Sequence, residues 1–91
     1  MRLKKGFELR TICGEHVISA TGIENINFDK IISLNETAAF IWQTAAELGV
    51  FTTPQLLDAL CKEYDVDRQQ AQSDIEALLV EWMKEGLLEV A

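Results

Sequence analysis

The sequence predicts an α+β domain in which a three-stranded antiparallel sheet is followed by three helices and a short C-terminal extended tail. Two observations carry this prediction. Apolar and polar side chains alternate over residues 7–20 around a glycine, and apolar side chains recur at helical spacing within residues 36–85. With 91 residues and a hydrophobic content of 48%, the chain has the size and composition of one domain around a single core. We therefore expect residues 1–91 to fold as a single domain.

The first two strands are expected to form a hairpin. Its loop, Gly14-Glu15, begins with the glycine that a type II′ turn favours. This loop brings the apolar faces of the two strands together by setting two antiparallel pairs, Thr11 with Ile18 and Leu9 with Ala20.

The third strand, at about residues 28–34, passes into the first helix with almost no loop. Ser33 and Glu36 have the spacing of a capping box, and Asn35 is a competing cap one register later. The first helix is expected over residues 36–47, with Gly49 ending it. Its buried face follows the i, i+3, i+4, i+7 pattern and consists of Ala38, Ile41, Trp42 and Ala45.

Two more helices are expected after Gly49. Thr53 should cap the second helix, with Pro54 at its first position and an apolar stripe of Leu57, Leu60, Cys61 and Tyr64. Asp67 should cap the third helix, residues 68–85, and Gly86 should end it. The extended tail after Gly86 is expected to add to the sheet or to pack under it; its apolar residues are Leu87, Leu88 and Val90.

The apolar face of the third helix is wider than a core contact requires. It spans about 140° at 100° per residue, against a minimum of roughly 100°, and Val80 lies outside it. This leaves apolar area either for a binding partner or for the tail. The residues of the face are Ala71, Ile75, Leu78, Leu79, Trp82 and Met83.

The charge distribution argues against nucleic-acid binding. Residues 1–30 contain five basic and four acidic side chains, a balance of +1, whereas residues 31–91 contain three basic and eleven acidic ones, a balance of −8. Affinity for nucleic acid comes mainly from clustered lysine and arginine at the phosphates. The helical half should repel nucleic acid and favour a basic or neutral partner.

No catalytic or metal-binding pattern stands out, so we expect no enzymatic activity, no cofactor and no metal site. The two cysteines, Cys13 and Cys61, form no CxxC pair, and His16 beside the hairpin turn is the sole histidine.

The start of the chain resembles that of a signal peptide in its basic residues Arg2, Lys4 and Lys5, but no apolar segment follows them. No stretch is long and apolar enough to span a membrane. We expect a cytoplasmic protein with no membrane association.

A free strand edge remains as the candidate binding site, because an extended peptide can add to it through main-chain hydrogen bonds. If the third helix packs beside the strand that precedes the first helix, apolar residues of both elements would line a groove. These residues are Ile31, Ile32, Ile75, Leu78, Leu79 and Trp82. The alternative for each of them is a place in the core.

The junction Leu34-Asn35-Glu36-Thr37-Ala38-Ala39, followed by Ile41-Trp42, resembles the PqqD family. Further matching positions are Leu56, Leu57, Leu60, Tyr64, Asp74, Ile75, Leu78, Leu79 and Gly86-Leu87-Leu88-Glu89. The resemblance implies a winged-helix-like domain that recognises the leader of a ribosomally made, post-translationally modified peptide. It also implies that the leader adds to the third strand against the third helix. The peptide-binding residues would then be Lys30, Ile31, Ile32, Ser33, Leu34, Asp74, Ile75, Leu78, Leu79 and Trp82.

We therefore predict a non-catalytic, peptide-binding adaptor, monomeric or weakly dimeric, that presents a precursor peptide to a modifying enzyme. The resemblance implies that this enzyme is a radical S-adenosylmethionine enzyme. The alternatives are a winged-helix DNA-binding regulator and a structural or dimerisation module. Replacing Ile32 by proline should abolish peptide addition and spare the fold, provided that the N–H of Ile32 faces the open edge.

Overall fold

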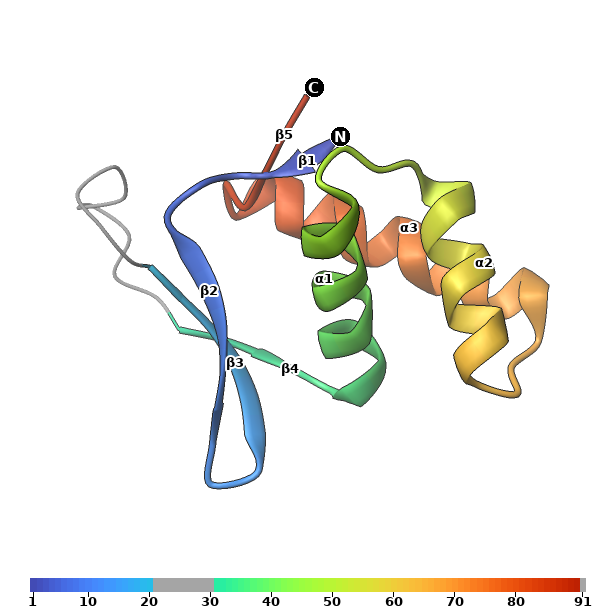
Figure 1. Cartoon of the computed structure of the whole chain (residues 1–91), viewed down its shortest axis with the longest axis horizontal. Coiled ribbons are helices and arrows are strands. Elements are labelled where there is room, and N and C mark those ends of the chain that lie inside the picture. The colour runs from blue at the N-terminus through green and yellow to red at the C-terminus, as the bar shows by residue number, and fades with distance from the viewer. Residues whose placement is uncertain (21–30, 91) are drawn as a thin grey trace.

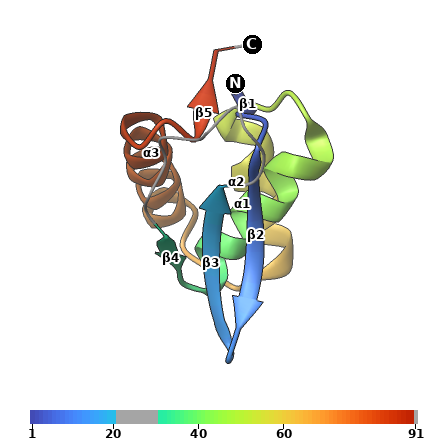
Figure 2. The same ribbon diagram turned by 90° about the vertical axis from the view of Figure 1, so that its left-hand side faces the viewer.

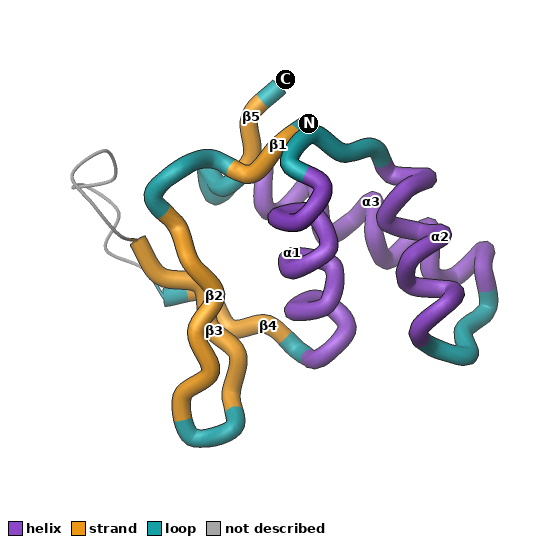
Figure 3. The backbone as a smooth tube through the Cα atoms, viewed as in Figure 1, coloured by secondary structure: helices purple, strands orange, loops and turns teal. Residues whose placement is uncertain are grey.

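The computed structural model describes residues 1–20 and 31–90. Figures 1 and 3 show a sheet on one side of the molecule and three helices on the other. The three-stranded sheet consists of β2 (Phe7–Ile12), β3 (Glu15–Ala20) and β4 (Ile32–Leu34). The helices are α1 (Glu36–Leu48), α2 (Thr53–Glu63) and α3 (Arg68–Lys84). This arrangement confirms the predicted α+β class, and it is compatible with a winged helix.

The sheet has the order β2-β3-β4, and both of its strand pairs are antiparallel. The predicted hairpin register was wrong by two residues, because Leu9 pairs with Ile18 and Thr11 with His16. The loop is Cys13-Gly14, whose φ angles of 51° and 80° are both positive, as a type I′ turn requires. A shift of two residues leaves every side chain on its own face, so the predicted apolar faces still meet.

The type I′ turn makes Cys13 a site where a substitution should stabilise the protein. A left-handed conformation costs an ordinary L-residue roughly 1–2 kcal/mol, and Cys13 is the non-glycine residue with positive φ in the described part of the chain. Asparagine tolerates this conformation, and Asn-Gly is the preferred type I′ pair. We expect Cys13→Asn to raise the free energy of unfolding by about 1 kcal/mol, measured by urea denaturation and circular dichroism. A Cys13→Ala control should show no gain, and equal stability of the two variants would contradict the turn assignment.

Helix α1 starts with Asn35 as its cap. The Asn35 side chain accepts a hydrogen bond from the backbone N–H of Ala38 at 2.8 Å. The predicted capping box of Ser33 and Glu36 is therefore wrong: Ser33 lies in β4, and the competing cap Asn35, two residues later, caps the helix. The helix ends at Gly49, as predicted, with φ at 77°.

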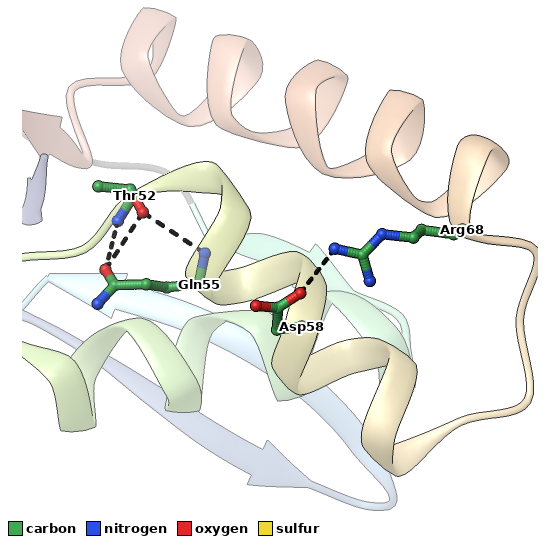
Figure 4. Close-up of polar contacts among 4 residues, drawn as sticks. All are labelled: Thr52, Gln55, Asp58 and Arg68. Carbon is green, nitrogen blue, oxygen red and sulfur yellow. Dashed lines mark hydrogen bonds and ion pairs between the residues drawn. The ribbon is translucent and has the colours of Figure 1, made fainter.

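Helix α2 starts one residue earlier than predicted, because Thr52 rather than Thr53 is its cap. Thr52 and Gln55 form a reciprocal capping box, in which the backbone N–H of Thr52 donates to Gln55 Oε1 at 2.9 Å (Figure 4). The glutamine two residues after Thr53 was the missed signal. Asp67 caps α3 as predicted, through its carboxylate and the N–H of Gln70 at 3.1 Å.

The C-terminal tail does not join the main sheet. Its strand β5 (Leu88–Glu89) pairs with β1 (Arg2–Leu3) in a separate two-stranded sheet, which the sequence had not suggested. Main-chain bonds tie this second sheet to its neighbours: Lys4 N–H donates to Leu87 C=O, and Phe51 N–H to Met1 C=O, both at 2.8 Å. The tail is thereby fixed across the start of the chain.

The core lies between the main sheet and the helices. Helix α1 buries all four predicted residues, and α3 contributes Ala71, Ile75, Leu79 and Trp82. At the centre, the rings of Trp42 and Trp82 meet edge to face with centroids 5.1 Å apart. The sheet adds Ile18 and Leu34. The described residues contain no helix that is long and apolar enough to cross a membrane.

Candidate functional site

Strand β4 lies at the edge of the main sheet and has one free side. Figure 2 shows β3 between β2 and β4, with α3 on the β4 side of the sheet. Within residues 1–20 and 31–90, no strand pairs with the outer edge of β4. An extended segment could therefore add to β4 beside α3.

The register of the sheet determines which main-chain groups of β4 face outward. Ile12 and Glu15 flank the two-residue turn and form a hydrogen-bonded pair, and such pairs alternate with non-hydrogen-bonded ones along an antiparallel ladder. It follows that β3 directs His16 and Ile18 toward β4, where they face Leu34 and Ile32. Ser33, opposite Val17, belongs to the non-hydrogen-bonded pair. Its N–H and C=O therefore point to the open edge.

A groove of about 600 Å³ lies between the start of α1 and the exposed side of α3, and it begins at Asn35, the residue that follows β4. Its floor is apolar, with Ala38 and Ile41 from α1, and Ala71, Ile75 and Leu78 from α3. Leu60 of α2 and Val66 of the following loop close one end. The alanine side chains in this lining are short, so they do not fill the space between α1 and α3.

A second hollow of about 410 Å³ continues from the groove at the C-terminal end of β4. Asn35 lines both, so the two depressions meet at the cap of α1. The second hollow reaches the hairpin turn at Gly14 and contains Ser33 in its wall. Ser33 thus borders the second hollow, which lies next to the groove at Asn35.

The polar rim of the groove belongs mainly to α3. Asp67, Gln70, Asp74 and Glu81 line it. Gln70 Nε2 donates to Asp74 Oδ1 at 2.9 Å, which holds both side chains along the rim. At the N-terminal end of α3, Arg68 points away from the rim to Asp58 of α2, at 2.7 Å (Figure 4). This hydrogen bond raises the pKa of Arg68, whose charge is engaged with α2.

The structure brings only part of the predicted site together. Asp74, Ile75 and Leu78 line the groove. Ile31 is 68% exposed, Ile32 is half-buried, and Ser33 is exposed at the edge. Leu34 is buried in the core, and Lys30 lies outside the described residues.

Besides Leu34, two predicted site residues lie in the core and do not line the groove. Trp82 is 1% exposed and packs on Trp42, and Leu79 is 5% exposed. The wide apolar face of α3 is divided: one side packs in the core, and Leu78 reaches the groove. Val80 and Met83 are exposed on a third side. The sequence analysis did not identify the wall from α1, formed by Thr37, Ala38 and Ile41, or the rim residues Gln70 and Glu81 of α3.

The rim could have been predicted from helical spacing. Its residues Asp67, Gln70, Asp74 and Glu81 are three, four and seven positions apart, which places them on one side of α3.

The family model described as "Coenzyme PQQ synthesis protein D (PqqD)" matches residues 15–88, most of the chain. The chain belongs to the PqqD family. This confirms the resemblance that the α1 junction suggested. The sequence matches no curated protein.

Two solved structures resemble the PqqD-family chain along nearly all of its length. One, "TbiB1 in Complex with the TbiA(beta) Leader Peptide", has a TM-score of 0.79 and 23% identity over 100% of this chain and 98% of its own. The other, "Lasso peptide synthetase B1 complexed with the leader peptide", has a TM-score of 0.71 and 26% identity over 94% of this chain and 93% of its own. The first likeness establishes the fold, and both neighbours are similar proteins solved with a leader peptide.

Proposed function

We propose that this PqqD-family chain is a non-catalytic adaptor that binds the leader of a ribosomally made precursor peptide and presents the peptide to a modifying enzyme. The observation that carries the proposal is the open edge of β4 beside the groove between α1 and α3. Support comes from the lasso peptide synthetase B1 at 26% identity, which was solved with a leader peptide.

The proposed mechanism needs no reactive side chain. The leader adds to β4 as a further strand, and the N–H and C=O of Ser33 pair with its main chain. Alternate leader side chains then point toward α3, where the apolar floor at Ile75 and Leu78 receives them. Holding the leader raises the effective concentration of the attached core segment at the enzyme.

The modifying enzyme supplies the chemistry in this proposal. The family resemblance makes a radical S-adenosylmethionine enzyme the first candidate, and the iron–sulfur chemistry would then reside there. A DNA-binding role fits the surface less well, because α3 presents carboxylates along the groove and Arg68 is engaged with Asp58.

A backbone-amide NMR titration with the synthetic leader of the nearest encoded short peptide tests the proposal. We expect saturable shifts at residues 31–34 and along the groove side of α3 at micromolar peptide. A duplex DNA oligonucleotide, added in parallel, should cause no such shifts. Shifts confined to other surfaces, or a response to DNA that weakens steeply with salt, would contradict the peptide-binding role.

A further inference from the structure

Five carboxylates line the groove and the second hollow. Asp67, Asp74 and Glu81 border the main groove. Glu15 and Glu36 border the second hollow. Among the residues that the structure describes, neither lining contains a lysine or an arginine. The floor of the groove is apolar, so these charges form an acidic rim around a surface suited to an extended peptide.

The α3 part of the rim is a straight row. Asp67, Asp74 and Glu81 are separated by seven residues each, two turns that return the side chain to nearly the same side of the helix. At 1.5 Å per residue the row extends over about 21 Å, the length of about six residues of extended chain. A row of this length can meet several side chains of one extended peptide.

Little within the described residues neutralises this rim. Asp67 is committed to capping α3, and Asp74 accepts a neutral amide hydrogen bond from Gln70. The described ion pairs of the chain join other residues, namely Arg2 with Glu89, Arg10 with Glu8, and Arg68 with Asp58. Residues 21–30 contain one lysine against two acidic residues, so their net charge adds no positive balance.

We propose that the peptide segment bound in this groove is cationic, with lysine or arginine on the strand face that points to α3, and that Asp74 and Glu81 select it. This inference rests on the proposed function and specifies its substrate class. Long basic side chains suit the geometry, because their methylene stems pack on the apolar floor while their charged ends reach the rim. An acidic leader would meet like charges along the full length of the row.

Selection from a displayed library of random 12-residue peptides tests the inference without knowledge of the natural leader. The baits are the native protein, the double variant Asp74→Asn/Glu81→Gln, and Glu76→Gln as the matched control. Glu76 is also on α3, but it lies outside both hollows along β4. The native protein and the control should enrich peptides with basic residues at alternate positions, and the double variant should lose that preference.

Affinities of one selected basic peptide, measured by fluorescence anisotropy, give the size of the effect. We expect the double variant to bind about three- to tenfold more weakly, as for two partly exposed ion pairs, and with a smaller dependence on salt. The control should bind like the native protein. Equal affinity of the double variant would overturn the assignment of Asp74 and Glu81.

A fourth bait, Ser33→Pro, separates failure of this inference from failure of the proposed function. If the native protein enriches neutral or acidic peptides and Ser33→Pro does not, peptide addition stands and the cationic specificity is overturned. If basic peptides bind equally well to Ser33→Pro, they bind away from the β4 edge, which overturns both. Enrichment of no peptide by the native protein also overturns both.

Discussion

Replacing Trp82 by alanine is expected to lower the melting temperature by at least about 15 °C, because the indole fills the centre of the core. Trp82 is 1% exposed and packs edge to face on Trp42. Truncating a buried tryptophan to alanine costs about 3–5 kcal/mol, a large part of the roughly 5–15 kcal/mol by which small domains are stable. Thermal denaturation followed by circular dichroism measures the change.

The same experiment decides between the two roles that the sequence allowed for Trp82. A groove residue would lose peptide affinity on truncation and keep its stability, whereas a core residue would lose stability first. Val80→Ala is the matched control on α3, since Val80 is 56% exposed, and its effect should stay within about 0.5 kcal/mol. If Trp82→Ala melts at the same temperature as Val80→Ala, Trp82 is not a core residue and the groove assignment is correct.

The fold was predictable to the extent that local signals decide it. The i, i+3, i+4, i+7 pattern identified the buried face of α1 correctly, because a helix with one apolar face can bury it in one way only. Caps were less predictable. Ser33, Asn35 and Thr53 all have the right chemistry for capping, and which residue caps depends on where the preceding strand or loop ends. The hairpin register failed for a related reason: Gly14 fits the second position of a type I′ turn as well as the first of a type II′ turn.

Long-range features were beyond local signals. Strand β1 pairs with β5, so that Arg2 lies opposite Glu89. Each strand has only two residues, and neither contains a signal that predicts the other as its partner. In the site, the alternation of Asp74, Ile75 and Leu78 between rim and floor was within reach of helical spacing. The division of the wide α3 face between core and groove could not be predicted from this spacing, because it depends on how α1 and α2 pack against that helix. Trp82 and Leu79 were therefore placed in the groove although they belong to the core.

Replacing Ser33 by proline is expected to weaken leader binding by about ten- to a hundredfold while the domain stays folded. Proline removes the N–H that faces the open edge, and its ring occupies the position of the incoming strand. The leader carbonyl that would pair with this N–H then remains unsatisfied, which costs about 1–3 kcal/mol. Isothermal titration with the leader peptide measures the loss, and circular dichroism verifies the fold.

A proline at the opposite edge of the sheet provides the control. Thr11 pairs with His16 in a non-hydrogen-bonded pair, so its N–H points to the free side of β2. Thr11→Pro should leave leader affinity unchanged, which separates loss of the β4 edge from a general effect of proline on the sheet. Equal binding by the Ser33→Pro and native proteins would contradict strand addition at β4.

Ile32→Pro, the substitution that the sequence first suggested, has a different expected outcome. Ile32 pairs with Ile18 in a hydrogen-bonded pair, so its N–H points inward to β3 and not to the leader. Proline there breaks the ladder between β3 and β4 and should destabilise the domain together with its binding. Neighbouring residues of one short strand thus separate the two functions of its main chain: Ile32 holds β4 to the sheet, and Ser33 offers the edge to a ligand.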